Sequence, residues 1–552
     1  MGFTIWARSG GHGLDVDVIL SGGTVFRGLA GGMAEALALS KGRVLAVGST
    51  DDVEALAGPG TRHIDLDGRL AIPAFHEAHM HLLPFGLALS QVNLRAEEVR
   101  SLEEVRRRLR AAARETPKGQ WVLGGGYDHG ALDIGRHPSV AELDAAVPDH
   151  PVFITRACGH MGVANSAALR AAGIGHNTPD PEGGVIERRG GALTGLIQER
   201  ALALIKAAIP APDEARLVGA IETAGRHLAA LGFASASDMN VGMIADMAEV
   251  PAFLRAAGEG RCLQRMWLVL AGNPEGIAAA AWEAGMRPWQ PGDDPDALLR
   301  WGAVKVFADG SAGGLTAAFL DPYLVGDTTG VFTFPTETIH ELLARYHAQG
   351  WQLDIHAIGD AAIEQVLTGM EALDATPARR HRIEHCGFVT PGQRRRMLAR
   401  GILPVPQPIF MHEFGDLYLT NLGRERSENA YPMHDWLEEG AHPSASSDAP
   451  VSTPDPFLNL FTMVTRRTNR GTVLGPGQRL SIAQALHCYT WCGAYSSFAE
   501  TRRGTLEPGM DADIAVLSQD ITALPPEAYS QVRADLTLRG GVPIFDRHGE
   551  FA

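Results

Sequence analysis

The sequence predicts an α/β protein with three parts: a (β/α)8 TIM barrel, a composite β-sandwich built from both ends of the chain, and a subdomain inserted after the first barrel strand. Three observations predict it. Short strand-like runs occur at both ends, strand-like and helical runs alternate through the middle, and one connection in the middle is far longer than the others. The length of 552 residues also exceeds what one simple core usually supports.

The two ends of the chain, residues 1–70 and 500–552, share the same pattern of short apolar runs between glycine-containing turns. In the first part these runs lie at 16–20, 34–39, 42–47 and 63–66, and in the last part at 512–517 and 534–544. Short strands need partners to bury their faces, and chain termini commonly lie close together. We therefore expect both ends to form one composite sandwich.

The middle of the chain, residues 71–499, reads as a series of βα units. Amphipathic stretches such as 338–349 and 361–373 follow several of its strand-like runs. Eight units are the count of a (β/α)8 barrel. The eight strand-like runs lie within 71–83 and at 232–237, 265–270, 303–307, 352–356, 382–385, 402–405 and 442–446.

The long interval between the first and second of these runs predicts the inserted subdomain. We place it at residues 119–198, with a glycine-rich turn at 124–126 and a strand at 151–154. The other intervals are close to the length of one βα unit. Loops and insertions of this kind commonly carry substrate specificity on a barrel scaffold.

Composition and charge exclude several classes of partner. A net charge of −16 argues against nucleic acid and against an anionic membrane surface. No run is long and apolar enough to span a bilayer. The first ten residues lack a signal-peptide core, and Trp6 stands where a myristoylation signal needs Ser or Thr. Five cysteines form no disulfide framework, so a reducing, cytoplasmic location is expected. The expected partner is a small-molecule substrate. Homo-oligomerisation is left open.

Histidines at the end of the first barrel strand provide the first candidate site. His79 and His81 are two apart, so on an extended strand both imidazoles can reach one point, as half of a metal site would require. An isolated His-x-His pair is at least as often an ordinary polar strand end. The pair becomes informative only if other strand ends supply further ligands.

Further ligand types do follow the ends of other strands. Lys305 lies on the fourth strand, His356 and His385 end the fifth and sixth, and Asp448 follows the eighth. The C-terminal ends of barrel strands meet on one face, where barrel enzymes place their chemistry. A lysine inside a barrel is costly to keep charged; as a neutral amine it is a nucleophile and can add carbon dioxide to form a carbamate.

These residues lie in stretches that resemble the amidohydrolase superfamily, and within it the amidohydrolase-3 branch that includes the N-substituted formamide deformylases. The resemblance extends over nearly the whole chain, including 509–514 near its end. It implies a sandwich made from both termini, a (β/α)8 barrel and a binuclear metal centre bridged by a carbamylated lysine. The matching stretches are 73–81, 159–166, 304–311, 316–318, 356–360, 382–385 and 446–451.

The resemblance also implies roles for single residues. His79, His81 and Asp448 would hold one metal ion, and His356 and His385 the other. The carbamate of Lys305 would bridge the two ions, and Asp448 would also be the catalytic proton shuttle. His160, from the insertion, is expected on the substrate side on the same basis, and Tyr127 is expected there because it belongs to the aromatic surface that the loops and the insertion offer. The expected cofactors are two divalent ions, zinc by preference, although imidazole and carboxylate ligands suit several metals.

The function expected on this basis is hydrolysis of a C–N bond in an amide, N-formyl or cyclic amide compound by a metal-bridged hydroxide. One alternative is a single-metal deaminase of the same superfamily. Those enzymes resemble sites without the strand-4 lysine, often with Glu three residues after the strand-5 histidine, where this chain has Gly359. The other alternative is a non-catalytic scaffold on the same barrel, against which the complete ligand set argues.

Overall fold

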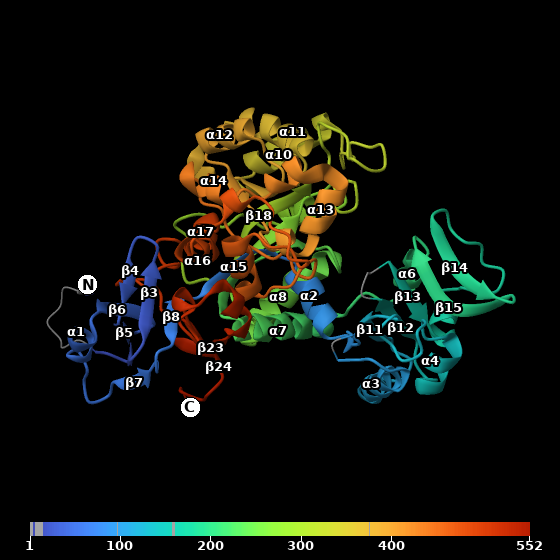
Figure 1. The fold of residues 1–552 in the computed structure, drawn as a ribbon, viewed down its shortest axis with the longest axis horizontal. Helices are drawn as coiled ribbons and strands as arrows, with labels where there is room; N and C mark the ends of the chain where they lie inside the picture. The colour runs from blue at the N-terminus through green and yellow to red at the C-terminus, as the bar shows by residue number, and fades with distance from the viewer. Residues whose placement is uncertain (1–3, 6–14, 97, 157–159, 375, 552) are drawn as a thin grey trace. The chain divides into compact units, whose positions relative to one another are not determined.

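The structure is a computed structural model that describes residues 4–5, 15–96, 98–156, 160–374 and 376–551. The chain forms two compact units (Figure 1). One unit comprises Met1–Leu83 and Ala224–Ala552, and the other Pro84–Thr223. The expectation about Trp6 and the chain start falls outside the described residues.

Two β-sheets in the first unit combine both ends of the chain. Strand β22 pairs antiparallel with β8, with Ile514 opposite Pro73 and Leu517 opposite Leu70. One buried apolar cluster contains Val18 and Leu37 of one sheet together with Val516 of the other. The five-stranded sheet has the order β1 (Thr4–Ile5), β6 (Arg43–Gly48), β5 (Ala36–Ser40), β2 (Val18–Ser21), β7 (Arg62–Asp65). The six-stranded sheet has the order β24 (Val542–Asp546), β23 (Ala534–Arg539), β22 (Ile514–Leu517), β8 (Leu70–Pro73), β3 (Thr24–Gly28), β4 (Gly32–Ala34).

A third sheet of seven parallel strands continues directly from β8 and forms a nearly closed barrel. Its order is β9 (Phe75–Met80), β16 (Phe233–Val241), β17 (Arg265–Ala271), β18 (Leu299–Phe307), β19 (Gln352–Ala357), β20 (Arg382–His385), β21 (Leu403–Val405). Seven of the eight expected strands are confirmed. Their side chains are almost all buried, as expected when helices cover a parallel sheet.

Helices connect consecutive strands of this sheet, which is the arrangement of βα units. The expected helices at 338–349 and 361–373 are confirmed as α10 and α11. The connecting helices are α8 (Glu249–Gly258), α9 (Ala278–Glu283), α10 (Thr336–Ala348), α11 (Asp360–Glu371) and α12 (Pro391–Arg400). After β21 follow α13 (Ile409–Glu428), α14 (Met433–Glu438), α15 (Pro456–Thr465), α16 (Ile482–Tyr489) and α17 (Trp491–Ser496).

The eighth strand, expected at 442–446, does not form, because this segment makes isolated hydrogen bonds in place of a ladder. Pro443 has no N–H to donate. The Ser444 N–H donates to Pro404 O of β21 at 3.2 Å, whereas the next N–H, of Ala445, donates to Cys488 O of α16. Further on, Asp448 N–H donates to His79 O of β9 at 2.8 Å. The segment therefore joins the two edge strands of the sheet without being a strand itself.

The second unit is built on a sheet of six strands. Its order is β10 (Val92–Asn93), β11 (Val122–Tyr127), β12 (Val152–Arg156), β13 (Met161–Ala164), β15 (Ala192–Glu199), β14 (Gly184–Arg189). The expected strand at 151–154 is confirmed as β12. The expected turn at 124–126 is wrong, because these glycines lie within β11. A Cβ at Gly126 would lie 2.5 Å from Arg95 Cγ, so the glycine permits close packing rather than a turn.

Helices cover this second sheet, and the longer of them are amphipathic. Ser101 and Ser139 cap the helices α3 and α4 at their N-termini. The helices of this unit are α3 (Leu102–Glu115), α4 (Val140–Ala146), α5 (Ser166–Ala171) and α6 (Leu202–Ala208). In the part of the chain that the structure describes, no helix combines the length and the apolar content needed to cross a bilayer.

Candidate metal centre

Five of the six predicted ligands lie at or near the C-terminal ends of parallel strands. His79 is the penultimate residue of β9, and His356 is the penultimate residue of β19. Lys305 is near the end of β18, and His385 ends β20. His81 directly follows β9, and Asp448 lies in the segment that joins the sheet edges. The shared strand direction thus brings residues far apart in the sequence to one face.

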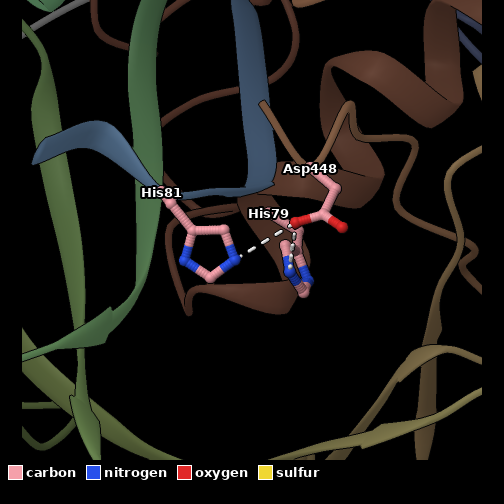
Figure 2. A group of neighbouring side chains, drawn as sticks. All are labelled: His79, His81 and Asp448. Atoms are coloured by element: carbon pink, nitrogen blue, oxygen red, sulfur yellow. Dashed lines mark ion pairs between the residues drawn. The ribbon is translucent and has the colours of Figure 1, made fainter. Parts of the chain in front are cut away.

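The nitrogen and oxygen atoms of three of these residues form a tight group. One ligand atom from each of His79, His81 and Asp448 lies within 4.8 Å of the others (Figure 2). Asp448 Oδ1 is 3.2 Å from His79 Nε2 and also 3.2 Å from His81 Nε2. The three side chains are buried or nearly so.

The other three predicted ligands adjoin this group. Lys305 Nζ lies 3.4 Å from His79 Nε2. The ring centroid of His385 is 4.8 Å from that of His79 and 4.3 Å from that of His356. The structure therefore places all six side chains in one contiguous cluster, in which each contacts at least one other member.

Hydrogen bonds on the far side of three imidazoles fix which nitrogen carries the proton. The Nδ1 atom of His79 lies 2.6 Å from Glu384 Oε2, and that of His81 lies 2.8 Å from Met239 O. His385 Nδ1 lies 2.6 Å from Gln407 Oε1. Carboxylate and carbonyl oxygens only accept, so each Nδ1 carries a proton and donates. Each Nε2 therefore presents a lone pair to the cluster.

His356 is oriented the other way round. Its Nε2 lies 3.0 Å from Gly310 O and 3.2 Å from Asp309 Oδ1, so Nε2 carries the proton. The lone pair is then on Nδ1. Asp309 is itself held in place because its oxygens accept from the N–H groups of Ala318, Ile358 and Gly359.

The resulting electrostatics suit a cation. Burial and the nearby ammonium of Lys305 lower the pKa of His79, so its imidazole is neutral. Asp448 Oδ1 is buried without a hydrogen-bond partner among the described residues, and it faces two lone pairs at 3.2 Å. Lys305 Nζ can donate to His79 Nε2, but no donor in the described part of the chain reaches Asp448 Oδ1, and a buried acceptor without a donor is unfavourable. A divalent ion with nitrogen and oxygen ligands would satisfy all three, so the residues present fit a metal.

Lys305 is fully buried in the same cluster. Burial lowers its pKa to about 8, against the opposing effect of the Glu384 and Asp448 carboxylates. A substantial share of the amine is therefore uncharged slightly above neutral pH, the form that reacts with carbon dioxide.

A set of supporting residues was not assigned from the sequence. Glu384, which orients His79, is held by Arg382, whose Nε donates to Glu384 Oε1 at 2.7 Å. Arg382 also donates to Ala78 O of β9, the strand at the far edge of the sheet. Arg382 and Glu384 are two apart on one strand, and this spacing was the available signal. Gln407 and Asp309 also follow strand ends, but the atoms that they contact depend on the fold.

Backbone conformation contributes to the convergence. His385 has φ 64 and Asp448 has φ 59, both in the left-handed region that non-glycine residues seldom adopt. Adjacent residues of a regular strand point to opposite faces, yet Glu384 and His385 both contact the cluster. The left-handed residue at the strand end breaks the alternation and makes this possible.

The two predicted substrate-side residues lie in the second unit. Tyr127, at the end of β11, is buried, and its hydroxyl lies 2.8 Å from His137 Nδ1. His160 is exposed, and its Nδ1 lies 3.2 Å from Glu199 Oε2. Gly159, which precedes it in the motif, is outside the described residues. A substrate role for either residue stays a prediction.

A parallel α/β sheet with this donor set at its strand ends is typical of metal-dependent hydrolases. Residues 62–545 match the family model described as "Amidohydrolase family". The chain therefore belongs to the amidohydrolase family.

Relatives of the chain support this class. The chain is 29% identical over 533 residues to the N-substituted formamide deformylase of Arthrobacter pascens, which covers 94% of this chain and 96% of that protein. It is 29% identical over 526 residues to the protein LONG AFTER FAR-RED 3 of Arabidopsis thaliana, covering 92% and 88%. Among solved structures, an uncharacterized metal-dependent hydrolase from Pyrococcus horikoshii OT3 is similar with a TM-score of 0.76 and 28% identity, covering 92% of this chain and 99% of that one.

Proposed function

We propose that this protein is a binuclear metal-dependent hydrolase that cleaves a C–N bond in a small amide, N-formyl or cyclic amide compound. The observation that carries the proposal is the set of lone pairs that converge on one buried point. Three imidazoles present Nε2 there because their Nδ1 protons are engaged elsewhere, and Asp448 Oδ1 faces two of them without a donor.

The ligand assignment follows from position. His79, His81 and Asp448 would hold one ion, and His356 and His385 the second. Lys305, as a carbamate, would supply one oxygen to each ion. Two divalent ions, zinc by preference, would polarise a substrate carbonyl and activate water near neutral pH.

The residues of the chain then have distinct tasks. Asp448 would take the proton released by the attacking water and pass it to the departing nitrogen, since an amine leaves readily only when it is protonated. Glu384 and Gln407 would keep the rings of His79 and His385 in their working orientation. The strand-end position of these residues limits their movement during turnover.

The preference for C–N bonds is supported by the relative named N-substituted formamide deformylase, which is similar over nearly the whole chain.

We place His160 and Tyr127 on the substrate side of the metal centre. We also place the protein in the cytoplasm, and we leave homo-oligomerisation open. We also keep the domain boundaries: 1–70 with 500–552 as a sandwich, 71–499 as a (β/α)8 barrel and 119–198 as an insertion. The segment at 442–450 would take the place of the eighth barrel strand.

A single-metal deaminase is the second candidate. The observation that favours it is that only three ligands, His79, His81 and Asp448, meet in one tight group among the described residues. A carbamate on Lys305 would bring the remaining histidines into a second site, whereas an unmodified ammonium would repel a second ion.

Metal analysis together with a substrate panel tests the proposal. We expect about two ions per chain after reconstitution with bicarbonate, and formate release from N-substituted formamides. His385→Ala should lose at least one ion and nearly all turnover, whereas His63→Ala, at an exposed histidine, should retain both. One ion per chain with ammonia release would favour the deaminase. No bound metal in the wild type would contradict both and favour a scaffold.

A further inference from the structure

The N-terminal end of β18 holds a buried guanidinium that forms no ion pair among the described residues, although the carboxylates of Glu500 and Asp511 act on it at longer range. Arg300, the second residue of the strand, is only 4% exposed. Its Nε is buried and has no hydrogen-bond partner, and no carboxylate in the described part of the chain forms an ion pair with it. A buried charge is normally paired, so this arginine lacks a partner that it should have.

Two tryptophans account for only part of the stabilisation. The Arg300 Cζ atom lies 5.3 Å from the ring centroid of Trp267 and 4.8 Å from that of Trp289. Both distances are suitable for cation–π attraction. The ring faces supply no oxygen to the N–H donors of the guanidinium, however, and five such donors are present.

Arg300 lines a cavity of about 160 Å³, together with residues of the segments 289–295 and 498–503. Two more arginines line this cavity, but both are neutralised. Arg502 Nη2 lies 2.7 Å from Asp511 Oδ1, and Arg503 Nε lies 3.0 Å from Asp511 Oδ2. Asp293 is the carboxylate among the lining residues, and it is exposed and accepts from Gln290 N–H. Among the three arginines that line the cavity, Arg300 is therefore the one without a paired carboxylate in the described part of the chain.

The charge on Arg300 persists at neutral pH. Burial, and then the neighbouring Arg503 and Arg265, lower its pKa to about 9, which still leaves the group protonated at pH 7. The cation therefore cannot be removed by deprotonation, as a buried lysine could be.

We propose that this cavity binds a small oxyanion, of the size of inorganic phosphate or a short carboxylate, with Arg300 as its main ligand. The planar guanidinium matches two oxygens of such an anion side by side. The volume is well below the ~300–1,000 Å³ of sites for drug-sized ligands, so a nucleotide is excluded. Anion binding here is independent of the metal centre at the other end of the strand.

The experiment is a titration of the metal-loaded protein with inorganic phosphate, followed by calorimetry and by thermal unfolding at constant ionic strength. We expect one phosphate per chain with a Kd in the millimolar range or below, and a Tm increase of about 1–3 °C near saturation. R300M should weaken binding at least tenfold. R424M, at an exposed arginine paired with Glu428, should bind like the wild type.

Further variants separate this site from the metal centre, which could also attract phosphate. H385A should keep phosphate binding if the anion sits at Arg300. Equal affinity in R300M and the wild type, loss of binding in H385A alone, or no binding at about 10 mM phosphate would each overturn the proposal. If R300M does not fold, R300K takes its place, because lysine keeps the positive charge but cannot bind two oxygens side by side. An unchanged phosphate affinity in R300K would overturn the role of Arg300.

Titration with acetate and benzoate in place of phosphate distinguishes the two sources of the oxyanion. Tighter binding of benzoate supports a carboxylate held beside Trp289 and Phe498, which line the cavity. Tighter binding of phosphate supports the inorganic ion. In both cases R300M should abolish the preference.

Discussion

Strand β18 carries a buried basic side chain near each end, and the groups that surround these two side chains differ. Lys305, toward the C-terminal end, is 3.4 Å from His79 Nε2 and is influenced by the carboxylates of Glu384 and Asp448. Arg300, at the N-terminal end, faces two tryptophan rings and has no paired carboxylate among the described residues. A lysine can lose its proton when it is buried, whereas an arginine cannot. One end is thus suited to chemical change, and the other to a permanent charge.

The largest effect is expected at the lysine end. Lys305→Ala should lose metal and reduce activity on the order of 10³-fold or more, because the proposed carbamate bridge cannot form. Lys305→Arg should fail equally, since guanidinium cannot form a carbamate. Metal analysis and turnover measure both, with Lys118→Ala, at an exposed lysine, as the control. Acetate or formate should restore part of the metal content and activity of Lys305→Ala by filling the vacated bridge. Two-metal occupancy in Lys305→Arg without either anion would show that no carbamate is needed.

The pH dependence of the free energy of unfolding tests whether Lys305 loses its proton in the folded protein. Burial gives Lys305 a pKa of about 8 in place of 10.5, so between these values the folded metal-free protein has released a proton that the unfolded chain still binds. The free energy of unfolding should therefore rise from pH 8 to 10.5, by up to about 3 kcal/mol, and be insensitive to this group below pH 8. Urea unfolding of chelated, carbon dioxide-free protein measures it. The same rise in Lys305→Met would assign it to another group.

The packing around Arg300 can be tested by displacing Trp267, one of the two rings that it contacts. A Cβ at Gly302 would lie 1.9 Å from Trp267 Cζ2, so Gly302→Ala must displace the tryptophan that Arg300 contacts. We expect a loss of about 1–3 kcal/mol in the free energy of unfolding. Gly258→Ala, where a Cβ meets open space, is the control. Denaturant unfolding compares the two, and equal stability of both variants would mean that Trp267 moves freely.

The smallest effect is expected from Gln407, which orients the proposed metal ligand His385 without contacting the ion itself. Gln407→Leu removes the oxygen that accepts from His385 Nδ1–H at 2.6 Å and leaves the imidazole free to rotate. Metal affinity should fall roughly tenfold while the fold is kept. Competition with a chelator measures the affinity, and Gln407→Glu, which keeps an acceptor, should restore most of it. An unchanged affinity in Gln407→Leu would show that packing alone orients the ring.

The difference between Lys305 and Arg300 also shows which site residues can be predicted from the sequence. Lys305 was identifiable because a lysine inside an apolar strand is unusual and because other ligand types follow neighbouring strand ends. Arg300 gave no comparable signal, since its lack of an ion pair depends on the nearby carboxylates being paired with other arginines, which only the fold determines. The same holds for Glu384 and Gln407, whose roles depend on which atoms of His79 and His385 they reach.

Errors in the fold prediction have a similar origin. The run at 442–446 has strand-like composition, but its amides bond to partners on both β21 and α16, which local pattern does not reveal. The glycines at 124–126 suggested a turn, yet they allow close contact between neighbouring strands. In both places a tertiary contact overrides the local preference of the chain.

The non-strand segment that joins β21 to β9 has a consequence for the order of folding. Asp448 N–H bonds to His79 O, and His81 N–H bonds to Ala449 O at 2.8 Å, so this join requires contacts between parts of the chain more than 360 residues apart. Contacts of such long sequence separation form slowly. The proposed metal site at His79, His81 and Asp448 therefore depends on these long-range contacts, and an ion bound there would hold the two distant segments together.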